Sequence, residues 1–208
     1  MAAAASSSTS TPVTPSRQVH LLVACHGLWG QPLHLQYLIE KLVKAHDGEI
    51  SPTGAEPEED DDDPSTDSTP TPAPSVTAHE DEPQLVALIT ASNEETKTYD
   101  GIDWCSERIV REIDREMKRL KRQNRKVVRF SIFGYSLGGL MARYTIGLLH
   151  ARGFFDEIEP VNFTTFATPH VGITKTTGWF AKLAEFVGGR LLGRTGAQIV
   201  SRSTLRRT

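Results

Sequence analysis

The sequence is poor in cysteine and lacks any long apolar run. Its 208 residues include two cysteines, Cys25 and Cys105, which are too few for a disulfide-stabilised scaffold. No apolar stretch approaches the roughly 18–20 residues that a membrane-spanning helix needs. The N-terminus has neither the basic nor the apolar segment of a secretory signal. These absences favour an intracellular, cytoplasmic protein over a secreted or integral membrane protein.

Basic residues are missing from one long segment of the chain. Residues 47–83 hold 13 acidic residues and no lysine or arginine, so the rest of the chain carries 13 acidic against 23 basic residues. An acidic segment rich in Ser, Thr and Pro buries too little apolar surface to offset the entropy cost of ordering. We therefore expect residues 47–83 to form a disordered insert, 1–17 a disordered tail, and 194–208 an irregular basic tail.

The other residues, 18–46 and 84–193, alternate between apolar runs and helical patterns. Strand and helix in alternation are typical of a parallel sheet covered on both faces, so the predicted fold class is α/β. We expect one domain over 18–193, interrupted by the acidic insert. The apolar runs predict strands over 19–25, 84–90, 127–133 and 161–167, and the helical spacing predicts helices over 32–46, 103–122 and 140–150.

The turn after the third predicted strand carries the G-x-S-x-G pattern, as Gly134-Tyr135-Ser136-Leu137-Gly138. A sharp strand-to-helix turn needs small residues, and it places the serine hydroxyl above the carboxyl edge of the sheet. The helix that begins at Leu137 points its free N–H groups at an oxyanion formed there. The pattern predicts Ser136 as a catalytic nucleophile; a glycine-rich turn without chemistry is the alternative.

A second glycine-rich turn, His26-Gly27-Leu28-Trp29-Gly30, follows the first predicted strand. Acyl transfer needs two N–H donors aimed at the developing oxyanion. We expect the backbone N–H groups of Leu28 and Leu137 to form this oxyanion hole; an ordinary turn with a buried Trp is the alternative. The residues expected to line the pocket are His26, Gly27, Trp29, Tyr135 and His170.

Four segments together resemble the serine esterase family of the α/β-hydrolase fold, which includes fungal lipid-droplet phospholipases and related lipases. They are LLVACHGLWGQPLHLQYLIEKL, TYDGIDWCSERIVREI, FSIFGYSLGGLMARYTIGLL and NFTTFATPHVGI. The resemblance implies an α/β-hydrolase-type, mostly parallel sheet with helices on both faces. It also implies an intracellular lipase or esterase in which Ser136 is the nucleophile, residues 26–30 form the oxyanion loop, and residues 99–102 lie near the substrate cleft.

A serine nucleophile needs a base and an orienting acid, which follow it along the chain in this fold. After Ser136 the sequence has one aspartate, Asp156, and two histidines, His150 and His170. Asp156 and His150 fall at the amino edge of the predicted sheet, away from the serine, whereas His170 falls at the carboxyl edge. The resemblance places the acid and base in later strands, so we expect a C-terminally truncated hydrolase with an incomplete sheet.

The predicted activity is hydrolysis of carboxylic esters of lipids, with no cofactor and no metal site. A lipid ester is the expected substrate, with peripheral contact at a membrane or lipid-droplet surface.

Residues 178–193 fit either a lid that meets lipid or an ordinary core helix. The excess of basic residues outside 47–83 can favour nucleic-acid binding. No nucleic-acid-binding motif accompanies it, so we expect no nucleic-acid partner. The alternative function is that of an inactive fragment acting as an interaction or regulatory protein.

Overall fold

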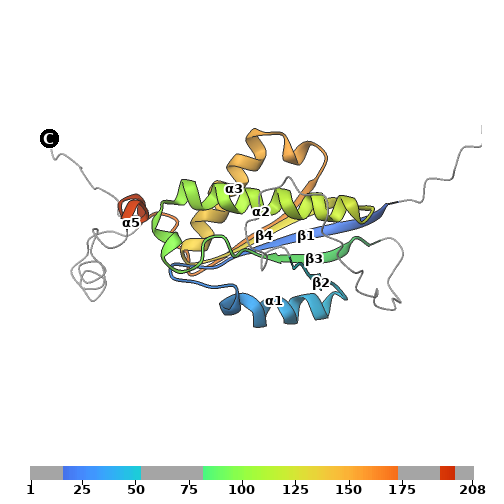
Figure 1. The fold of residues 1–208 in the computed structure, drawn as a ribbon, viewed down its shortest axis with the longest axis horizontal. Coiled ribbons are helices and arrows are strands. Elements are labelled where there is room, and N and C mark those ends of the chain that lie inside the picture. The colour runs from blue at the N-terminus through green and yellow to red at the C-terminus, as the bar shows by residue number, and fades with distance from the viewer. Residues whose placement is uncertain (1–15, 53–81, 173–192, 200–208) are drawn as a thin grey trace, which may run out of the picture.

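The computed structural model describes residues 16–52, 82–172 and 193–199 (Figure 1). Its described part contains a five-stranded sheet in the order β2-β3-β1-β4-β5, in which every neighbouring pair is parallel. The α/β prediction is therefore confirmed. The strands are β1 (Arg17–Cys25), β2 (Glu49–Ile50), β3 (Gln84–Ile89), β4 (Arg125–Tyr135) and β5 (Glu159–Phe166). The helices are α1 (Leu33–Ala45), α2 (Ile102–Arg122), α3 (Leu137–Ala151) and α5 (Gly193–Ile199), with short 3₁₀ helices η2 (Glu95–Tyr99) and η3 (Phe154–Asp156).

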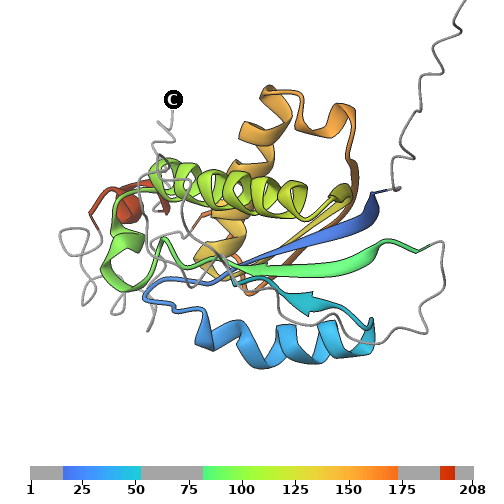
Figure 2. The same cartoon turned by 45° about the vertical axis from the view of Figure 1, so that its right-hand side comes forward.

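Helices cover both faces of the sheet (Figures 1 and 2). Helix α1 lies on one face, and α2 and α3 lie on the other. On the α1 side the buried stripe is Leu35, Ile39 and Val43, which packs on inward-facing residues of β1 and β3. Leu38 and Leu42 on the same helix are exposed.

Helix α2 buries the apolar stripe that its spacing predicts, together with two carboxylates. Ile109, Ile113 and Leu120 are fully buried in the larger core cluster. Glu112 accepts hydrogen bonds from the backbone N–H groups of the loop after β3, and Glu116 accepts one from Ser51, just after β2, at 2.7 Å. Burial raises the pKa of Glu112. These two side chains tie α2 to the loops that follow two strands of the sheet.

The structure corrects two boundaries drawn from composition. The predicted disordered insert begins at residue 47, but Glu49–Ile50 forms β2 and pairs with β3 at Val86 and Ala87. A two-residue strand is too short to show a hydrophobic period, and the repetitive acidic composition begins only beyond it. Residues 53–81 lie outside the described residues, as do most of the expected N-terminal tail and residues 173–192.

The predicted irregular tail at 194–208 is the second correction. Residues Gly193–Ile199 form helix α5, and Thr195 is fully buried. The Thr195 hydroxyl donates to the Thr98 carbonyl oxygen at 2.6 Å and accepts from the Gly101 N–H at 2.9 Å. A seven-residue polar helix lacks an amphipathic stripe, and hydrogen bonds to the segment before α2 hold it instead. Residues 200–208 lie outside the described residues.

Both cysteines are buried free thiols. Burial raises the pKa of Cys25 and Cys105, that of Cys105 to about 11. Neither thiol is therefore a ready nucleophile at neutral pH. Within the part of the chain that the structure describes, none of the helices combines the length and the apolar composition needed to cross a membrane.

Candidate active site

The turn between β4 and α3, residues 134–138, is called the serine turn below. It holds Ser136 at φ 53° and ψ −120°, a conformation that costs a non-glycine residue about 1–3 kcal/mol. The Ser136 N–H donates to the Phe166 carbonyl oxygen at 2.8 Å, and the Thr168 hydroxyl donates to the Ser136 carbonyl oxygen at 2.9 Å. Hydrogen bonds from the end of β5 thus fix both backbone polar groups of the strained serine.

Close packing explains the glycines around Ser136. A Cβ atom at Gly138 would lie 2.2 Å from the Cys25 carbonyl oxygen, closer than any real contact. A Cβ atom at Gly27 would lie 3.0 Å from the Ser136 Cβ. Because β1 and β4 are parallel neighbours, the residues that follow them meet at one edge of the sheet. The serine turn and the segment after β1 therefore lie in direct contact.

The segment after β1, residues 26–32, is called the β1 loop below. Its Trp29 has φ 54°, a second non-glycine residue in the left-handed region. The Trp29 backbone N–H donates to the Thr98 hydroxyl oxygen at 3.4 Å, and its indole N–H donates to the Tyr99 hydroxyl. The two aromatic rings meet edge to face, with centroids 6.1 Å apart. Residues of η2 therefore hold the β1 loop in shape.

Two backbone N–H groups are candidate donors at the contact between the β1 loop and the serine turn. Leu28 follows Gly27, which packs against Ser136, and Leu137 follows Ser136 itself. Among the residues that the structure describes, no hydrogen-bond partner is found for the N–H group of either leucine. Leu137 also begins α3, whose N-terminus carries partial positive charge. Within the described residues, both N–H groups are therefore candidate donors to an anionic oxygen.

His26, predicted to line the pocket, is buried within the β1 loop, with 2% of its surface exposed. Its Nδ1 lies 3.0 Å from the Gly27 carbonyl oxygen, which can only accept, so Nδ1 carries the proton. Its Nε2 has no hydrogen-bond partner in the described part of the chain. Burial lowers the pKa of His26, so the ring is neutral at pH 7. The side chain supports the loop from within.

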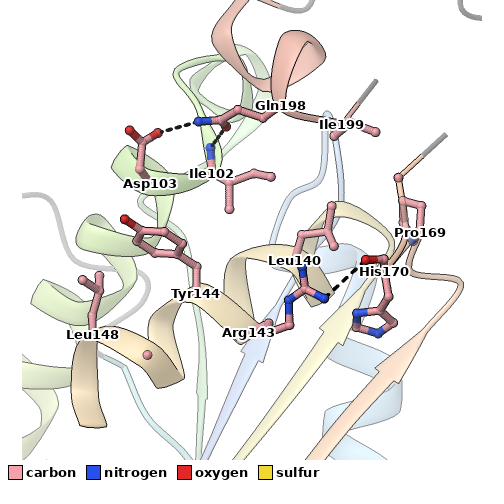
Figure 3. Close-up of a pocket in the computed structure, with 12 residues that line it drawn as sticks. Ile102, Asp103, Leu140, Arg143, Tyr144, Leu148, Pro169, His170, Gln198 and Ile199 are labelled. Carbon is pink, nitrogen blue, oxygen red and sulfur yellow. Dashed lines mark hydrogen bonds between the residues drawn. The ribbon is translucent and has the colours of Figure 1, made fainter. Parts of the chain in front are cut away.

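A cavity of about 590 Å³ lies against α3 and begins at Leu140, one helical turn after Ser136 (Figure 3). His170 is at this cavity, with its Nε2 2.9 Å from the Thr165 hydroxyl and its carbonyl oxygen accepting from Arg143 at 3.3 Å. Gly27, Trp29 and Tyr135, also predicted to line a pocket, are not among the described residues around it. The described lining residues are Ile102 and Asp103 of α2, Leu140, Arg143, Tyr144, Gly147 and Leu148 of α3, Pro169, His170 and Gly172 after β5, and Gln198 and Ile199 of α5.

Aromatic side chains surround the serine turn instead. Tyr135 and Phe166 stack with centroids 6.0 Å apart and ring planes 19° from parallel. Both are exposed, as is Trp29. Tyr135 and Phe166 thus border Ser136 at the carboxyl edge of the sheet, and with Trp29 of the adjoining β1 loop they are called the aromatic rim.

Comparison with known proteins decides the family. Residues 75–205 match the family model described as "Putative serine esterase (DUF676)". The chain belongs to this serine esterase family. The resemblance carried by the sequence motifs is thereby confirmed at the level of the family, and no solved structure matches the chain.

Three curated proteins that the chain resembles carry lipase names. "Putative lipase ROG1" of Saccharomyces cerevisiae is 24% identical over 189 residues, which is 89% of this chain and 22% of the relative. "Putative lipase C4A8.10" of Schizosaccharomyces pombe is 36% identical over 72 residues, 33% of this chain and 9% of the relative. "Putative lipase YDL109C" of S. cerevisiae is 33% identical over 75 residues, 35% of this chain and 11% of the relative. The matched part thus spans between about a tenth and a fifth of each relative's length.

Sequence reasoning missed two residues that support the candidate site, Thr98 and Thr168, and it named Tyr99 only within the segment that the resemblance places near the substrate cleft. Thr98 and Tyr99 hold Trp29, and Thr168 holds Ser136. Thr168 follows β5 directly, so its place at the carboxyl edge could have been inferred from the strand assignment. No local pattern marks Thr98 as a partner of Trp29, because their contact depends on how η2 lies across the β1 loop.

Proposed function

We propose that the chain is the serine-bearing part of an enzyme that hydrolyses carboxylic esters of lipids, with Ser136 as the nucleophile. The observation that carries the proposal is the conformation of Ser136. A serine held at positive φ between a buried strand and a helix has its hydroxyl at the tip of a sharp turn. Such strain persists only where the surrounding structure over-determines it, and it concentrates at functional sites.

In the proposed reaction, the Ser136 oxygen attacks the ester carbonyl carbon and its proton passes to a general base. The electron pair of the carbonyl moves to oxygen, and the N–H groups of Leu28 and Leu137 stabilise the resulting oxyanion. The alcohol then leaves with a proton from the base, and water hydrolyses the acyl-enzyme. No hydrogen bond between Ser136 and a histidine is found among the described residues, so we expect the base to lie outside them.

The aromatic rim favours an apolar substrate. Trp29, Tyr135 and Phe166 expose 48%, 43% and 66% of their surface beside the serine turn. Exposed aromatic groups gathered at one edge suit contact with the acyl chains of a lipid ester, and the relatives carry lipase names. We therefore propose a lipid ester as substrate, and peripheral contact of this edge with a membrane or lipid-droplet surface inside the cell.

A fluorophosphonate probe, which labels activated serines covalently, tests the proposal on the full 208-residue chain. Since an oxyanion hole and binding alone retain about 10³–10⁴-fold catalysis over water when the base is missing, we expect slow labelling of wild type and of Ser16→Ala, and none of Ser136→Ala. Labelling of wild type and of both variants alike would contradict the assignment of Ser136. A folded wild-type chain that takes no label would favour the alternative of an inactive protein that acts through binding.

A further inference from the structure

The β1 loop depends on a segment about 70 positions further along the chain. Four hydrogen bonds and one ring contact join η2 to this loop. Besides the two bonds from Trp29 to Thr98 and Tyr99, the Glu95 N–H donates to the Gly30 carbonyl oxygen at 3.1 Å. The Gln31 side-chain amide donates to the Glu95 carboxylate at 2.9 Å. Together these contacts fasten the outer side of the loop along its length.

The segment that supports the loop is itself held from the interior. Thr98 is fully buried, and its hydroxyl donates to the Glu95 carbonyl oxygen at 2.7 Å while accepting from Trp29. Its carbonyl oxygen accepts from the Thr195 hydroxyl, which in turn accepts from the Gly101 N–H. One buried hydroxyl of α5 therefore bridges the two ends of the turn from η2 into α2.

We propose that Thr98 and Tyr99 are positioning residues for the oxyanion hole, and that Thr195 locks them in place. The inference depends on the proposed function, because it assigns these residues to the Leu28 N–H. Trp29 sits at positive φ, so the loop would relax without contacts that hold it there. The Leu28 N–H shares a peptide plane with the Gly27 carbonyl oxygen, which accepts from the Gly30 N–H at 3.0 Å. Because η2 holds Trp29 and Gly30, it also holds this plane and keeps the Leu28 N–H from turning away.

The inference also explains why the contacts are polar and directional. An apolar contact would tolerate rotation of the loop, whereas two hydrogen bonds to the backbone and indole of one residue fix both its position and its orientation. A displacement of about 1 Å in a reacting group can cost on the order of a hundred-fold in rate. Thr98, Tyr99 and Thr195 thus act on the reaction through Trp29, without touching the substrate.

Three variants of the full chain test the inference: Tyr99→Phe, Thr98→Val and Thr195→Val. Each removes one hydroxyl and keeps the shape of the side chain. Tyr37→Phe is the matched control, because Tyr37 is exposed on α1 and its described contact is through the ring, with Lys41. Thr98→Ser restores the hydroxyl and should behave as wild type.

Two measurements separate positioning from chemistry. Amide hydrogen exchange of peptides covering residues 26–32 should be faster in the three variants than in wild type or Tyr37→Phe, with exchange in β1 and β4 unchanged. The rate of fluorophosphonate labelling of Ser136 should fall about ten-fold or more in the same variants. Tyr99→Phe removes a single half-buried hydroxyl and keeps the test valid if either threonine variant fails to fold.

The outcomes distinguish this inference from the proposed function. Unchanged exchange in residues 26–32 would overturn the positioning role. Faster exchange with an unchanged labelling rate would overturn the link between the loop and the oxyanion hole. If wild type takes no label but exchange rises in the variants, the proposed function fails while the structural role of Thr98 and Tyr99 stands.

Discussion

The serine turn and the β1 loop lie side by side at one edge of the sheet, yet different contacts hold them (Figure 2). In the serine turn, glycines allow backbone to pack on backbone, as where Gly138 meets the Cys25 carbonyl. In the β1 loop, hydrogen bonds from residues about 70 positions away hold Trp29. Both depend on distant partners, but a local motif marks the glycines of the serine turn, whereas no local pattern marks the residues that hold the β1 loop.

The largest expected effect is on the serine turn. Gly138→Ala would place a Cβ atom 2.2 Å from one backbone carbonyl oxygen and 2.5 Å from the next, that of His26, and neither can move aside cheaply. We expect a loss of more than about 3 kcal/mol in the free energy of unfolding, measured by urea denaturation.

Gly147→Ala is the matched control on the same helix. A Cβ atom there would meet nothing within 4 Å, and alanine favours a helix over glycine. We expect the free energy of unfolding of this variant to rise by about 0.5–1 kcal/mol. Equal losses at the two positions would contradict the view that close packing, rather than helix propensity, requires the glycine at 138.

The next largest expected effect is on the loop between β3 and η2, which leads to the segment that supports the β1 loop. Glu112→Ala would leave the N–H groups of Ala91 and Ser92 and the Ser92 hydroxyl without their buried acceptor. We expect the free energy of unfolding to fall by about 3 kcal/mol. Each unsatisfied buried group costs about 1–3 kcal/mol, and such costs do not simply add. Glu107 is exposed on the same helix, so the free energy of unfolding of Glu107→Ala should stay within about 0.5 kcal/mol of that of wild type.

The smallest effect is a pH dependence of the β1 loop. Burial lowers the pKa of His26, so the folded state binds its proton less readily than the unfolded chain does. The stability associated with neutral His26 is therefore complete above the ordinary pKa of 6.5 and is lost as pH falls below it. Between pH 5 and pH 8, the unfolding temperature of His26→Asn should change less with pH than that of wild type. The asparagine amide can still donate to the Gly27 carbonyl oxygen. Identical slopes would contradict this. His20, whose pKa burial also lowers, and Glu112, whose pKa burial raises, contribute to the slope that remains.

Most of the fold could be predicted because its elements are long and periodic. The apolar runs around β1, β3 and β4 and the stripe of Ile109, Ile113 and Leu120 on α2 carry the hydrophobic signal that strands and helices require. Strand β2 and helix α5 escaped prediction because each is held by contacts rather than by a pattern. Two residues of β2 pair with β3, and Thr195 bonds to Thr98.

The candidate site divides in the same way. The G-x-S-x-G pattern was enough to expect a strained Ser136, because the strand, the turn and the helix are all local. The support of Trp29 by Thr98 and Tyr99 could not be read from spacing, since it depends on two segments meeting in space. The burial of His26 was missed for a related reason: a histidine after a strand gives no sign of which way its ring will face.

The position of β1 in the sheet has a consequence for how the protein is made. β1 lies between β3 and β4, and both of its partners follow it in the sequence. On the ribosome, the apolar residues of β1 emerge long before Gln84–Ile89 is synthesised to pair with them. At about 5–20 residues per second, this strand waits for several seconds without a partner. Chaperones that shield short apolar segments of nascent chains should therefore govern how much of this protein a cell recovers in its folded form.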